Sequence, residues 1–280
     1  MTEEAYGKLD QWREPAAFDE ATARDFAGRI ERRAQSADEA TTRAAYLDLL
    51  EIRPGERALD VGCGSGVVAR DLVRRVGPVG GVVGVDPSPA FLAIARELAT
   101  TAGLADQIDF RLGDARALPF DAAEFDVAVA ATTLSHVPDA ERAIPELARV
   151  LRPGGRAGIF DLDTDSFILN HPDRDLTRRI VGFLSNNGAI HGWLGRRLPG
   201  LLAAAGFEIV QIRAFTALQR DPEGFYAGVI TWGADQAVAA GAITSTERDQ
   251  WLATLREIQS AGQFLAGQTY LFTWGAKSTS

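Results

Sequence analysis

Apolar positions recur every three to four residues at the start of the chain and give way to short apolar runs later. Along residues 1–50, one face of a predicted helix holds Phe18, Thr22, Phe26 and Ile30. Ser36 and Glu39 have the spacing of a capping box and predict the start of a second helix. This stretch has too few apolar residues for a core of its own. We therefore expect residues 1–50 to be a helical cap on a main domain over residues 51–280.

Strand-like runs alternate with helical patterns over residues 57–162. The strand-like runs are 57–61, 81–85, 107–111, 125–130 and 156–161. Helical segments lie between them, and the Pro-Gly-Gly run at 153–155 predicts a turn after the last of these helices. Such alternation predicts an α/β fold with a doubly wound parallel sheet and helices on both faces. Ligands of these sheets bind at the carboxyl ends of the strands.

The C-terminal part carries a less regular pattern. We expect an irregular and then helical insertion at about 163–200, and a second, largely helical insertion at about 216–265; both would be lids on the main domain. The other expected elements are a helix over 198–205, a strand over 207–215, two helices within 221–262 and a final strand over 268–274.

A glycine-rich turn follows the first strand. Residues 57–66 read Arg-Ala-Leu-Asp-Val-Gly-Cys-Gly-Ser-Gly, so that Gly62, Gly64 and Gly66 alternate with small side chains. Glycine has no Cβ and tolerates positive φ, which lets a ligand approach the backbone at the start of a helix. A dinucleotide fingerprint would need a third glycine or an alanine where this chain has Val67. The turn is therefore typical of a nucleotide-like ligand but disfavours a bound pyrophosphate.

Acidic residues end the next two strands. Asp86, twenty positions after Gly66, could accept hydrogen bonds from two ribose hydroxyls, each worth roughly 1.5–3 kcal/mol. Its charge would repel a 2′-phosphate, which argues against NADP. Asp114 and Ala115 follow the third strand, where an acceptor and a backbone N–H could bind an adenine edge. Either acid alone would indicate only a solvated strand end, but the three elements in this order predict an adenosine-containing cofactor.

With these motifs the chain resembles the class I S-adenosylmethionine-dependent methyltransferases. Within them it is similar to the small-molecule group that includes ubiquinone/menaquinone-biosynthesis enzymes and natural-product O-, N- and C-methyltransferases. The resemblance covers about residues 50–162 and rests on 59–66, 83–88, 113–120, 125–127, 134–139 and 149–155. It implies a Rossmann-like seven-stranded sheet whose last strand runs antiparallel beside 207–215. It also implies S-adenosylmethionine as the cofactor.

The resemblance assigns cofactor contacts to matching residues. Gly62, Gly64 and Gly66 would lie against the methionyl part, with Cys63 between them as a small spacer, and Asp60 would bind the ammonium group through water. The other implied contacts are Asp86 on the ribose, Pro87 and Ser88 beside the adenine, Asp114 with Ala115 on the adenine edge, and Ala131 with Thr132 facing the methionyl end.

His136 is the candidate catalytic base. Methyl transfer from a sulfonium is a one-step displacement, so alignment of the reactants can supply about 7–11 kcal/mol in favourable cases. A base is needed only when the acceptor must lose a proton. His136 follows the fourth strand at the cofactor edge, and Asp161, at the end of the fifth strand, would orient it. Many relatives have a histidine pair where this chain has Ser135 and His136, so the alternative is that His136 only packs or caps the next helix.

The predicted lids hold further candidates. His191 would contact substrate, and His171 lies in the same insertion; the alternative is that both are exposed loop residues. The lid aromatics are Trp193, Phe225, Tyr226, Trp232 and Phe264. They would line an apolar substrate pocket or form core, and we favour core for most of them. Asp161, Asp163 and Asp165 alternate along an extended segment and so fall on both of its faces; we expect no metal site.

Composition narrows the class of partner. The chain has 280 residues and a formal net charge of -9, and Cys63 is its single cysteine, which excludes an intrachain disulfide. The negative charge, and the absence of a proline–aromatic motif at 131–134, argue against a nucleic-acid target. No apolar run approaches the ~18 residues of a membrane span, and the N-terminus lacks a signal-peptide core, so we expect a cytoplasmic protein without membrane insertion. A homodimer is kept as an alternative to a monomer.

The favoured interpretation is methyl transfer to a small, partly apolar metabolite, most simply O-methylation of the kind found in secondary metabolism. Three alternatives stay open from the sequence. They are a relative that uses the same cofactor for another reaction such as cyclisation, a noncatalytic S-adenosylmethionine-binding protein, and an NAD-dependent oxidoreductase.

Overall fold

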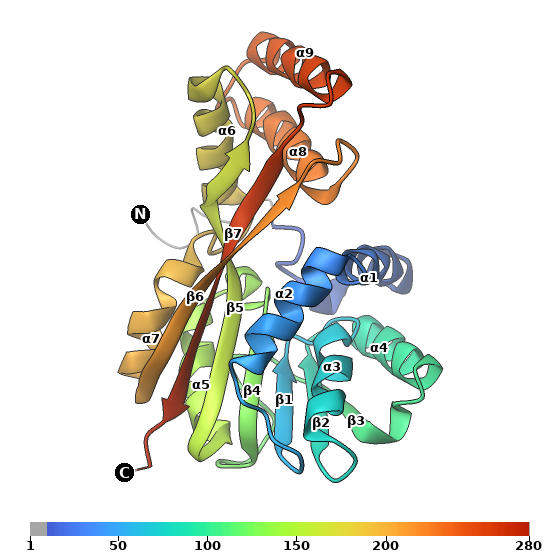
Figure 1. The fold of residues 1–280 in the computed structure, drawn as a ribbon, viewed down its shortest axis with the longest axis vertical. Helices are drawn as coiled ribbons and strands as arrows, with labels where there is room; N and C mark the ends of the chain where they lie inside the picture. The colour runs from blue at the N-terminus through green and yellow to red at the C-terminus, as the bar shows by residue number, and fades with distance from the viewer. Residues whose placement is uncertain (1–9, 280) are drawn as a thin grey trace.

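The computed structural model describes residues 10–279, apart from the side chains of residues 209 and 210. A seven-stranded sheet with helices on both faces forms its centre (Figure 1). The strands are β1 (Arg57–Val61), β2 (Gly81–Asp86), β3 (Ile108–Leu112), β4 (Phe125–Ala131), β5 (Leu151–Leu169), β6 (Phe207–Gln219) and β7 (Ala266–Lys277). Their order is β3-β2-β1-β4-β5-β7-β6, and β7 runs antiparallel to both of its neighbours. The predicted Rossmann-like fold is confirmed, including the antiparallel last strand.

Helices connect the strands and cover the sheet. They are α1 (Glu20–Ala34), α2 (Ala37–Asp48), α3 (Val67–Val76), α4 (Pro89–Thr101), α5 (Ala143–Val150), α6 (Arg174–Asn187), α7 (Leu198–Ala204), α8 (Phe225–Ala239) and α9 (Ser245–Ser260). Single 3-10 turns also occur, among them η4 (Leu134–His136) and η6 (Leu194–Arg196). Among the described residues, no helix combines the length and the apolar character needed to cross a lipid bilayer.

Alternate side chains of the central strands pack into two apolar layers. Leu59 of β1 belongs to a buried cluster with residues of α5 and α7, whereas Ala58 belongs to a cluster with residues of α2, α3 and α4. Successive side chains of a strand point to opposite faces. Asp60 therefore lies on the Ala58 side of the sheet, where α3 begins.

β5 is much longer than the predicted strand at 156–161. Residues 163–169, predicted to be irregular, continue β5 and pair with β7, from Asp163↔Thr269 to Leu169↔Ala266. A register shift between Asp163 and Ile168 absorbs the polar residues that suggested a loop. At the other end, 153–155 forms an irregularity within β5, at its register shift against β4, and not a separate turn. The extended β5, β6 and β7 reach beyond the rest of the sheet and carry α6, α8 and α9 (Figure 1).

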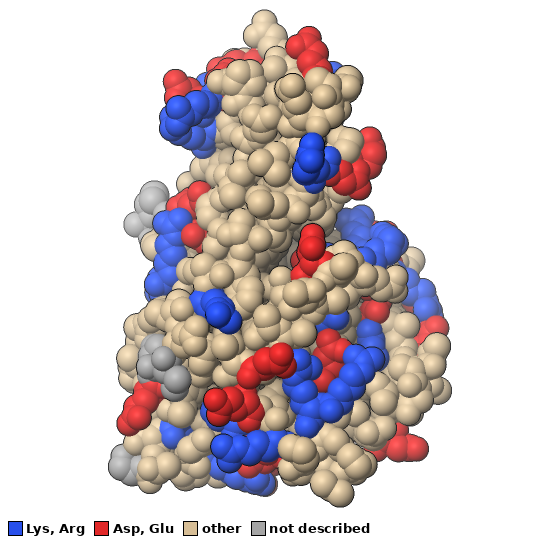
Figure 2. All heavy atoms as spheres, viewed as in Figure 1, with Lys and Arg blue, Asp and Glu red and all other residues tan. Residues whose placement is uncertain are grey.

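α1 and α2 pack against the central domain. Asp19 caps α1 by accepting a hydrogen bond from Thr22 N, and Ser36 caps α2 through Glu39 N. The apolar face of α1 packs on α4, with Phe26 and Ile30 beside a cluster that includes Phe91. Charged side chains of both signs crowd the face over α2 and α3, whereas in the upper part of the same view they lie along the top and the sides, around a tan middle (Figure 2).

Candidate active site

The glycine turn after β1 is anchored to the end of β2 by its own backbone. The N–H groups of Gly62 and Cys63 both donate to Val85 O, at 2.8 and 3.0 Å. Gly64 N donates to Asp86 Oδ2 at 2.9 Å. The Cys63 side chain is buried, and burial raises the pKa of its thiol well above the usual value. An inert spacer fits these surroundings better than a nucleophile does.

Two of the glycines are required by their surroundings. Gly62 has φ +70°, and a Cβ there would lie 2.2 Å from Cγ2 of Thr133, in the loop after β4. Gly66 has φ +83°, and a Cβ there would lie 3.0 Å from the Phe110 ring. The turn thus fits tightly between β3 and the β4 exit, and a side chain at either position would clash with Thr133 or with Phe110.

Asp60 is a buried carboxylate with one unsatisfied oxygen. It is 2% exposed, and its Oδ2 has no hydrogen-bond partner among the described residues. Burial raises the pKa of Asp60 to about 7, and the nearby charge of Asp86 adds to this, while the Ala69 N–H and Arg70 act in the opposite direction. A buried unpaired carboxylate is costly, so a cationic partner at Oδ2 would relieve the site.

Asp86 joins the glycine turn to the start of α4. One oxygen accepts from Gly64 N and the other from Ser88 N, both at 2.9 Å. Burial raises the pKa of Asp86 to about 6, against the effect of these two hydrogen bonds. Each carboxylate oxygen can accept a second bond, so both oxygens keep capacity for a ribose hydroxyl. Ser88 is also the N-cap of α4 and accepts a hydrogen bond from Phe91 N at 3.3 Å. Pro87 lies between Asp86 and Ser88.

The loop after β3 places Asp114 and Ala115 near the same edge. Asp114 is paired with Arg116, at 2.6 Å between Oδ2 and Nη2, and the Arg116 hydrogen bond is the main reason that the pKa of Asp114 is lowered. Ala115 is buried. Leu112, paired in register with Asp86, exposes 58% of its surface at this edge. The sequence prediction missed Leu112 as a site residue, because an apolar residue in a strand is expected to be buried in the core.

The exit of β4 is strained. Thr132 has φ +51°, which is rare for a β-branched residue, and its N–H donates to Phe160 O at 2.6 Å. Thr133 Oγ1 donates to Gly62 O at 3.3 Å. Ala131 and Thr132 directly precede Thr133, which contacts the glycine turn; strain of this kind is common at functional sites.

His136 is held by Asp10, a residue that the sequence prediction missed. Nδ1 of His136 lies 2.9 and 2.8 Å from the two carboxylate oxygens of Asp10. The Asp10 side chain is completely buried, and that of His136 is 19% exposed. Asp10 also accepts from Trp12 N at 2.8 Å, an Asx-turn that its sequence position could have suggested. Its contact with His136, 126 residues away, has no signal in the sequence.

Asp161, the residue expected to orient the ring, forms hydrogen bonds with backbone groups near it. Asp161 is buried and accepts hydrogen bonds from Ser135 N at 3.0 Å and from Leu162 N at 2.8 Å. It holds the backbone of η4, next to His136, and acts on the ring through its charge. The carboxylate in hydrogen-bond contact with the ring is that of Asp10. The catalytic assignment of both His136 and Asp161 stays a prediction.

The other acidic residues of β5 pair with an arginine. Asp163 accepts from Arg196 Nε at 3.0 Å, and Asp165 lies 3.5 Å from the same guanidinium. Within residues 10–279, no cluster of three or more His, Cys, Asp or Glu side chains is placed to hold a metal ion.

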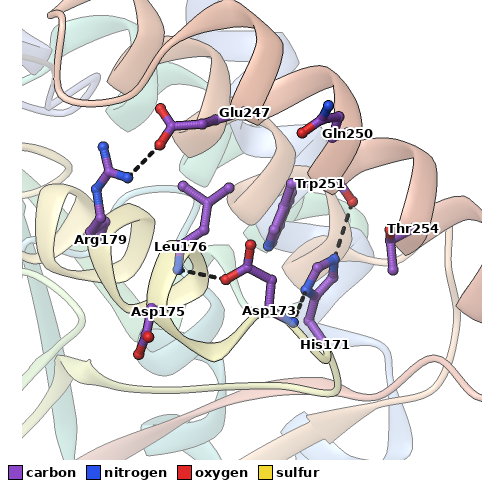
Figure 3. Close-up of a pocket in the computed structure, with 9 residues that line it drawn as sticks. All are labelled: His171, Asp173, Asp175, Leu176, Arg179, Glu247, Gln250, Trp251 and Thr254. Atoms are coloured by element: carbon purple, nitrogen blue, oxygen red, sulfur yellow. Dashed lines mark hydrogen bonds and ion pairs between the residues drawn. The ribbon is translucent and has the colours of Figure 1, made fainter.

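A separate pocket lies between α6 and α9, away from this edge. Its volume is about 260 Å³, and it contains His171, which stacks on Trp251 with ring centroids 4.8 Å apart (Figure 3). His171 is buried, not an exposed loop residue: Nδ1 accepts from Asp173 N, and Nε2 lies 3.1 Å from Trp251 O. Arg179 and Glu247 close the rim as an ion pair at 2.6 Å. These polar groups form hydrogen bonds and an ion pair with one another or with nearby backbone, so we interpret the pocket as a packing contact between two helices.

The remaining lid candidates divide between core and surface. Tyr226 and Phe264 are buried, as expected for core, whereas Trp193 and Phe225 remain 46% and 45% exposed. Trp232 packs against the core from a partly buried position. His191 lies beside η4, where its N–H donates to Ser135 O at 2.8 Å, and burial lowers its pKa.

Comparison with known proteins identifies the family. Residues 58–155 match the family model described as a methyltransferase domain. The chain is 30% identical over 176 residues to the ubiquinone/menaquinone biosynthesis C-methyltransferase UbiE of Edwardsiella ictaluri, covering 58% of this chain and 70% of that protein. The chain belongs to the S-adenosylmethionine-dependent methyltransferases. Their cofactor, S-adenosylmethionine, is the one that the glycine turn and Asp86 predict.

Two further similarities extend over more of the chain than the family model does. The chain is 33% identical over 228 residues to an uncharacterized 37.1 kDa protein in transposon TN4556 of Streptomyces fradiae, covering 81% of this chain and 64% of that protein. The solved structure of the cyclase SpnF has a TM-score of 0.54 at 23% identity, covering 86% of this chain and 81% of that one, which shows a shared fold. The chain spans 64%, 61% and 47% of the length of three curated relatives, less than two thirds of each.

The methyltransferase site fits the cofactor on two independent observations. The unsatisfied Oδ2 of buried Asp60 can pair with an ammonium group. Gly62 and Gly66 have positive φ and no room for a Cβ, because Thr133 and Phe110 pack against them, so the turn presents bare backbone. Both features lie on the edge of the sheet where ligands of this fold bind.

Proposed function

We propose that this methyltransferase methylates a hydroxyl oxygen of a small, partly apolar molecule. The observation that carries the proposal is His136, held by a buried carboxylate on the edge where the glycine turn lies. A hydroxyl must lose its proton during methylation, and a positioned imidazole is suited to take it. S-adenosylmethionine, when bound, supplies the electrophilic methyl group.

The cofactor contacts are proposed from the same geometry. Asp60 holds the ammonium group, and Asp86 accepts from the ribose hydroxyls with the lone pairs left over from its backbone bonds. The methionyl part lies along Gly62, Cys63, Gly64 and Gly66, and faces Ala131 and Thr132. The adenine lies by Pro87, Ser88, Asp114 and Ala115, with the exposed Leu112 against it.

The acceptor is proposed to lie between the central domain and its covering segments. Residues 1–50 would act as a cap and the insertions at about 163–200 and 216–265 as lids, since Asp10, Ile190 and Ser135 already meet beside His136. A cytoplasmic location, the exclusion of nucleic acids as substrates and a homodimer stay predictions from the sequence.

Isotope-labelled S-adenosylmethionine, incubated with the purified protein and a cell extract, tests the proposal by mass spectrometry of labelled small molecules. We expect the label on an oxygen. A label on carbon or nitrogen would contradict the hydroxyl assignment, and cofactor binding with no labelled product would favour a nonmethylating relative. Binding of NAD without binding of S-adenosylmethionine would refute the cofactor assignment.

Asp86→Ala tests the ribose contact by calorimetry. We expect affinity for S-adenosylhomocysteine to fall ten-fold or more, about 1.4 kcal/mol, because a charge-assisted pair is lost. The matched control is Asp109→Ala, because Asp109 is an exposed acid of β3 that pairs with Arg111. Equal affinity in both variants would show that Asp86 does not bind the ribose.

A further inference from the structure

Asp10 lies where three segments of the chain meet. Its fully buried side chain accepts hydrogen bonds from the N–H of Trp12, at 2.8 Å, and from that of Ile190, at 3.1 Å. The same carboxylate lies 2.8 Å from Nδ1 of His136. A buried carboxylate needs such partners, and the ring is one of the three that it has here.

We propose that Asp10 is a positioning residue for methyl transfer, which holds His136 with its proton on Nδ1 so that Nε2 takes the proton of the acceptor. This inference rests on the proposed function, because it depends on His136 acting as the base. It assigns part of the active site to the N-terminal segment, outside residues 58–155 that match the methyltransferase family model.

Hydrogen-bond chemistry fixes the direction of the proton transfer. An ionised carboxylate only accepts hydrogen bonds, so a neutral ring beside Asp10 carries its proton on Nδ1. Nε2 is then the basic nitrogen. When it removes the proton from the acceptor hydroxyl, the ring becomes positively charged, and the Asp10 carboxylate stays ionised beside it and stabilises that charge.

Charged side chains from three parts of the chain surround the His136 ring. Burial alone would lower the pKa of His136, but the hydrogen bond and charge of Asp10, with the charge of Asp161 on β5, raise it above its usual value. Arg33, on α1, acts in the opposite direction. The two carboxylates together outweigh burial and the guanidinium, and Asp10 is the one in contact with the ring.

A merely structural role for Asp10 can be separated from this one. Asp10 begins a turn, because Trp12 N donates to its side chain and Arg13 N to its carbonyl oxygen. An asparagine side chain can accept the same turn hydrogen bond. Unlike a carboxylate, it can also donate to Nδ1, which favours the other tautomer. Asp10→Asn therefore keeps the Trp12 hydrogen bond, gives up the acceptor for Ile190 N–H and changes the favoured tautomer of the ring.

Nitrogen-15 NMR of histidine-labelled protein tests the proposal, since the chain has three histidines. Above its titration midpoint, wild-type His136 should carry its proton on Nδ1 and show a bare Nε2. Asp10→Asn should move the ring toward the Nε2–H form and shift the titration midpoint to lower pH. Asp163→Asn is the control: it removes another buried carboxylate, one that pairs with Arg196, and should leave His136 unchanged.

Two results would overturn the role of Asp10: a wild-type ring protonated on Nε2, or the same tautomer and midpoint in Asp10→Asn as in wild type. The wild-type spectrum decides the tautomer even if the variant does not fold. Unchanged signals from His171, in the separate pocket between α6 and α9, report that it does fold. Absence of any methylated product would count against the proposed function and leave this measurement unaffected.

Discussion

The glycine turn and the Asp10–His136 pair lie at the same edge of the sheet, but they differ in how far apart their contacting residues are in the sequence. The turn is held by Val85 and Asp86, on a neighbouring strand, and Gly64 meets Asp86 across 22 residues. Asp10 meets His136 across 126 residues and Ile190 across 180. Strand pairing therefore fixes the glycine turn, which is the proposed cofactor side. The Asp10–His136 pair, on the proposed acceptor side, brings together the N-terminal segment, the loop after β4 and Ile190.

The two sides should differ in their response to change. Backbone hydrogen bonds within a buried parallel sheet open only with much of the domain, whereas segments docked through a few contacts open at lower free energy. If the cofactor side is fixed and the acceptor side docks separately, the enzyme can bind its cofactor before the acceptor side has formed. Changes to the turn should then affect cofactor binding strongly, and changes to the cap weakly.

Gly62→Ala is expected to have the largest effect. A Cβ at φ +70° and 2.2 Å from Thr133 Cγ2 must displace either the turn or the β4 exit. Backbone strain and overpacking each cost about 1–3 kcal/mol, so we expect affinity for S-adenosylhomocysteine to fall about 30-fold or more, with a lower melting temperature. Calorimetry and thermal unfolding measure the two effects.

Gly81→Ala is the matched control for that change. Gly81 begins the adjacent strand β2, has an ordinary φ, and a Cβ there would meet nothing within 4 Å. We expect near wild-type affinity and stability. If Gly62→Ala behaved in the same way, the turn would be more adaptable than its contacts indicate, and the contrast between the two sides would fail.

The same contrast explains what the sequence could predict. Asp60, Asp86 and Asp114 each end or follow a short apolar strand, so local periodicity places them at one edge before any tertiary contact is known. Asp10 precedes the first helix, and its partner His136 becomes its neighbour only through packing of the cap. A local pattern carries no information about such a pairing.

β5 and His171 are two more cases in which a local sequence pattern could not predict a contact with a distant part of the chain. The polar run after Asp161 resembles a loop, and it is β7, about a hundred residues later, that keeps it extended through pairs such as Ile168↔Gly267. His171 reads as a loop histidine because it precedes a proline. It is buried by Trp251, in a helix that sequence separation places far away.

Asp60 is expected to cause the next largest effect, which is a pH dependence of stability and of cofactor binding. Because its pKa is raised to about 7 from the usual 3.8, the folded protein without cofactor holds this proton to higher pH than the unfolded chain does. Its stability should therefore fall as pH rises through about 7. An ammonium group at Oδ2 would lower that pKa, so cofactor binding should release a proton and tighten as pH rises from about 6 to about 8.

Calorimetry in buffers of different ionisation enthalpy measures this proton. Asp60→Asn should abolish the release and weaken S-adenosylhomocysteine binding about ten-fold, through loss of the charge-assisted contact. Asp109→Asn is the control, because Asp109 is an exposed acid of β3 that pairs with Arg111. Unchanged proton release in Asp60→Asn would remove Asp60 from the ammonium site.

Glu31→Gln should have the smallest effect, because it tests the one described place where α1 touches the turn with charged groups. Glu31 accepts from Ser65 Oγ at 2.7 Å and pairs with Arg70 at 2.8 Å. Both charged side chains are partly exposed, and such pairs are worth about 0.2–1 kcal/mol, so we expect S-adenosylhomocysteine affinity to fall no more than about five-fold. Glu20→Gln, on the exposed side of the same helix, should change nothing measurable. A loss as large as that of Gly62→Ala would mean that the cap helps to form the turn, and that the cofactor side, like the acceptor side, depends on docking of distant segments.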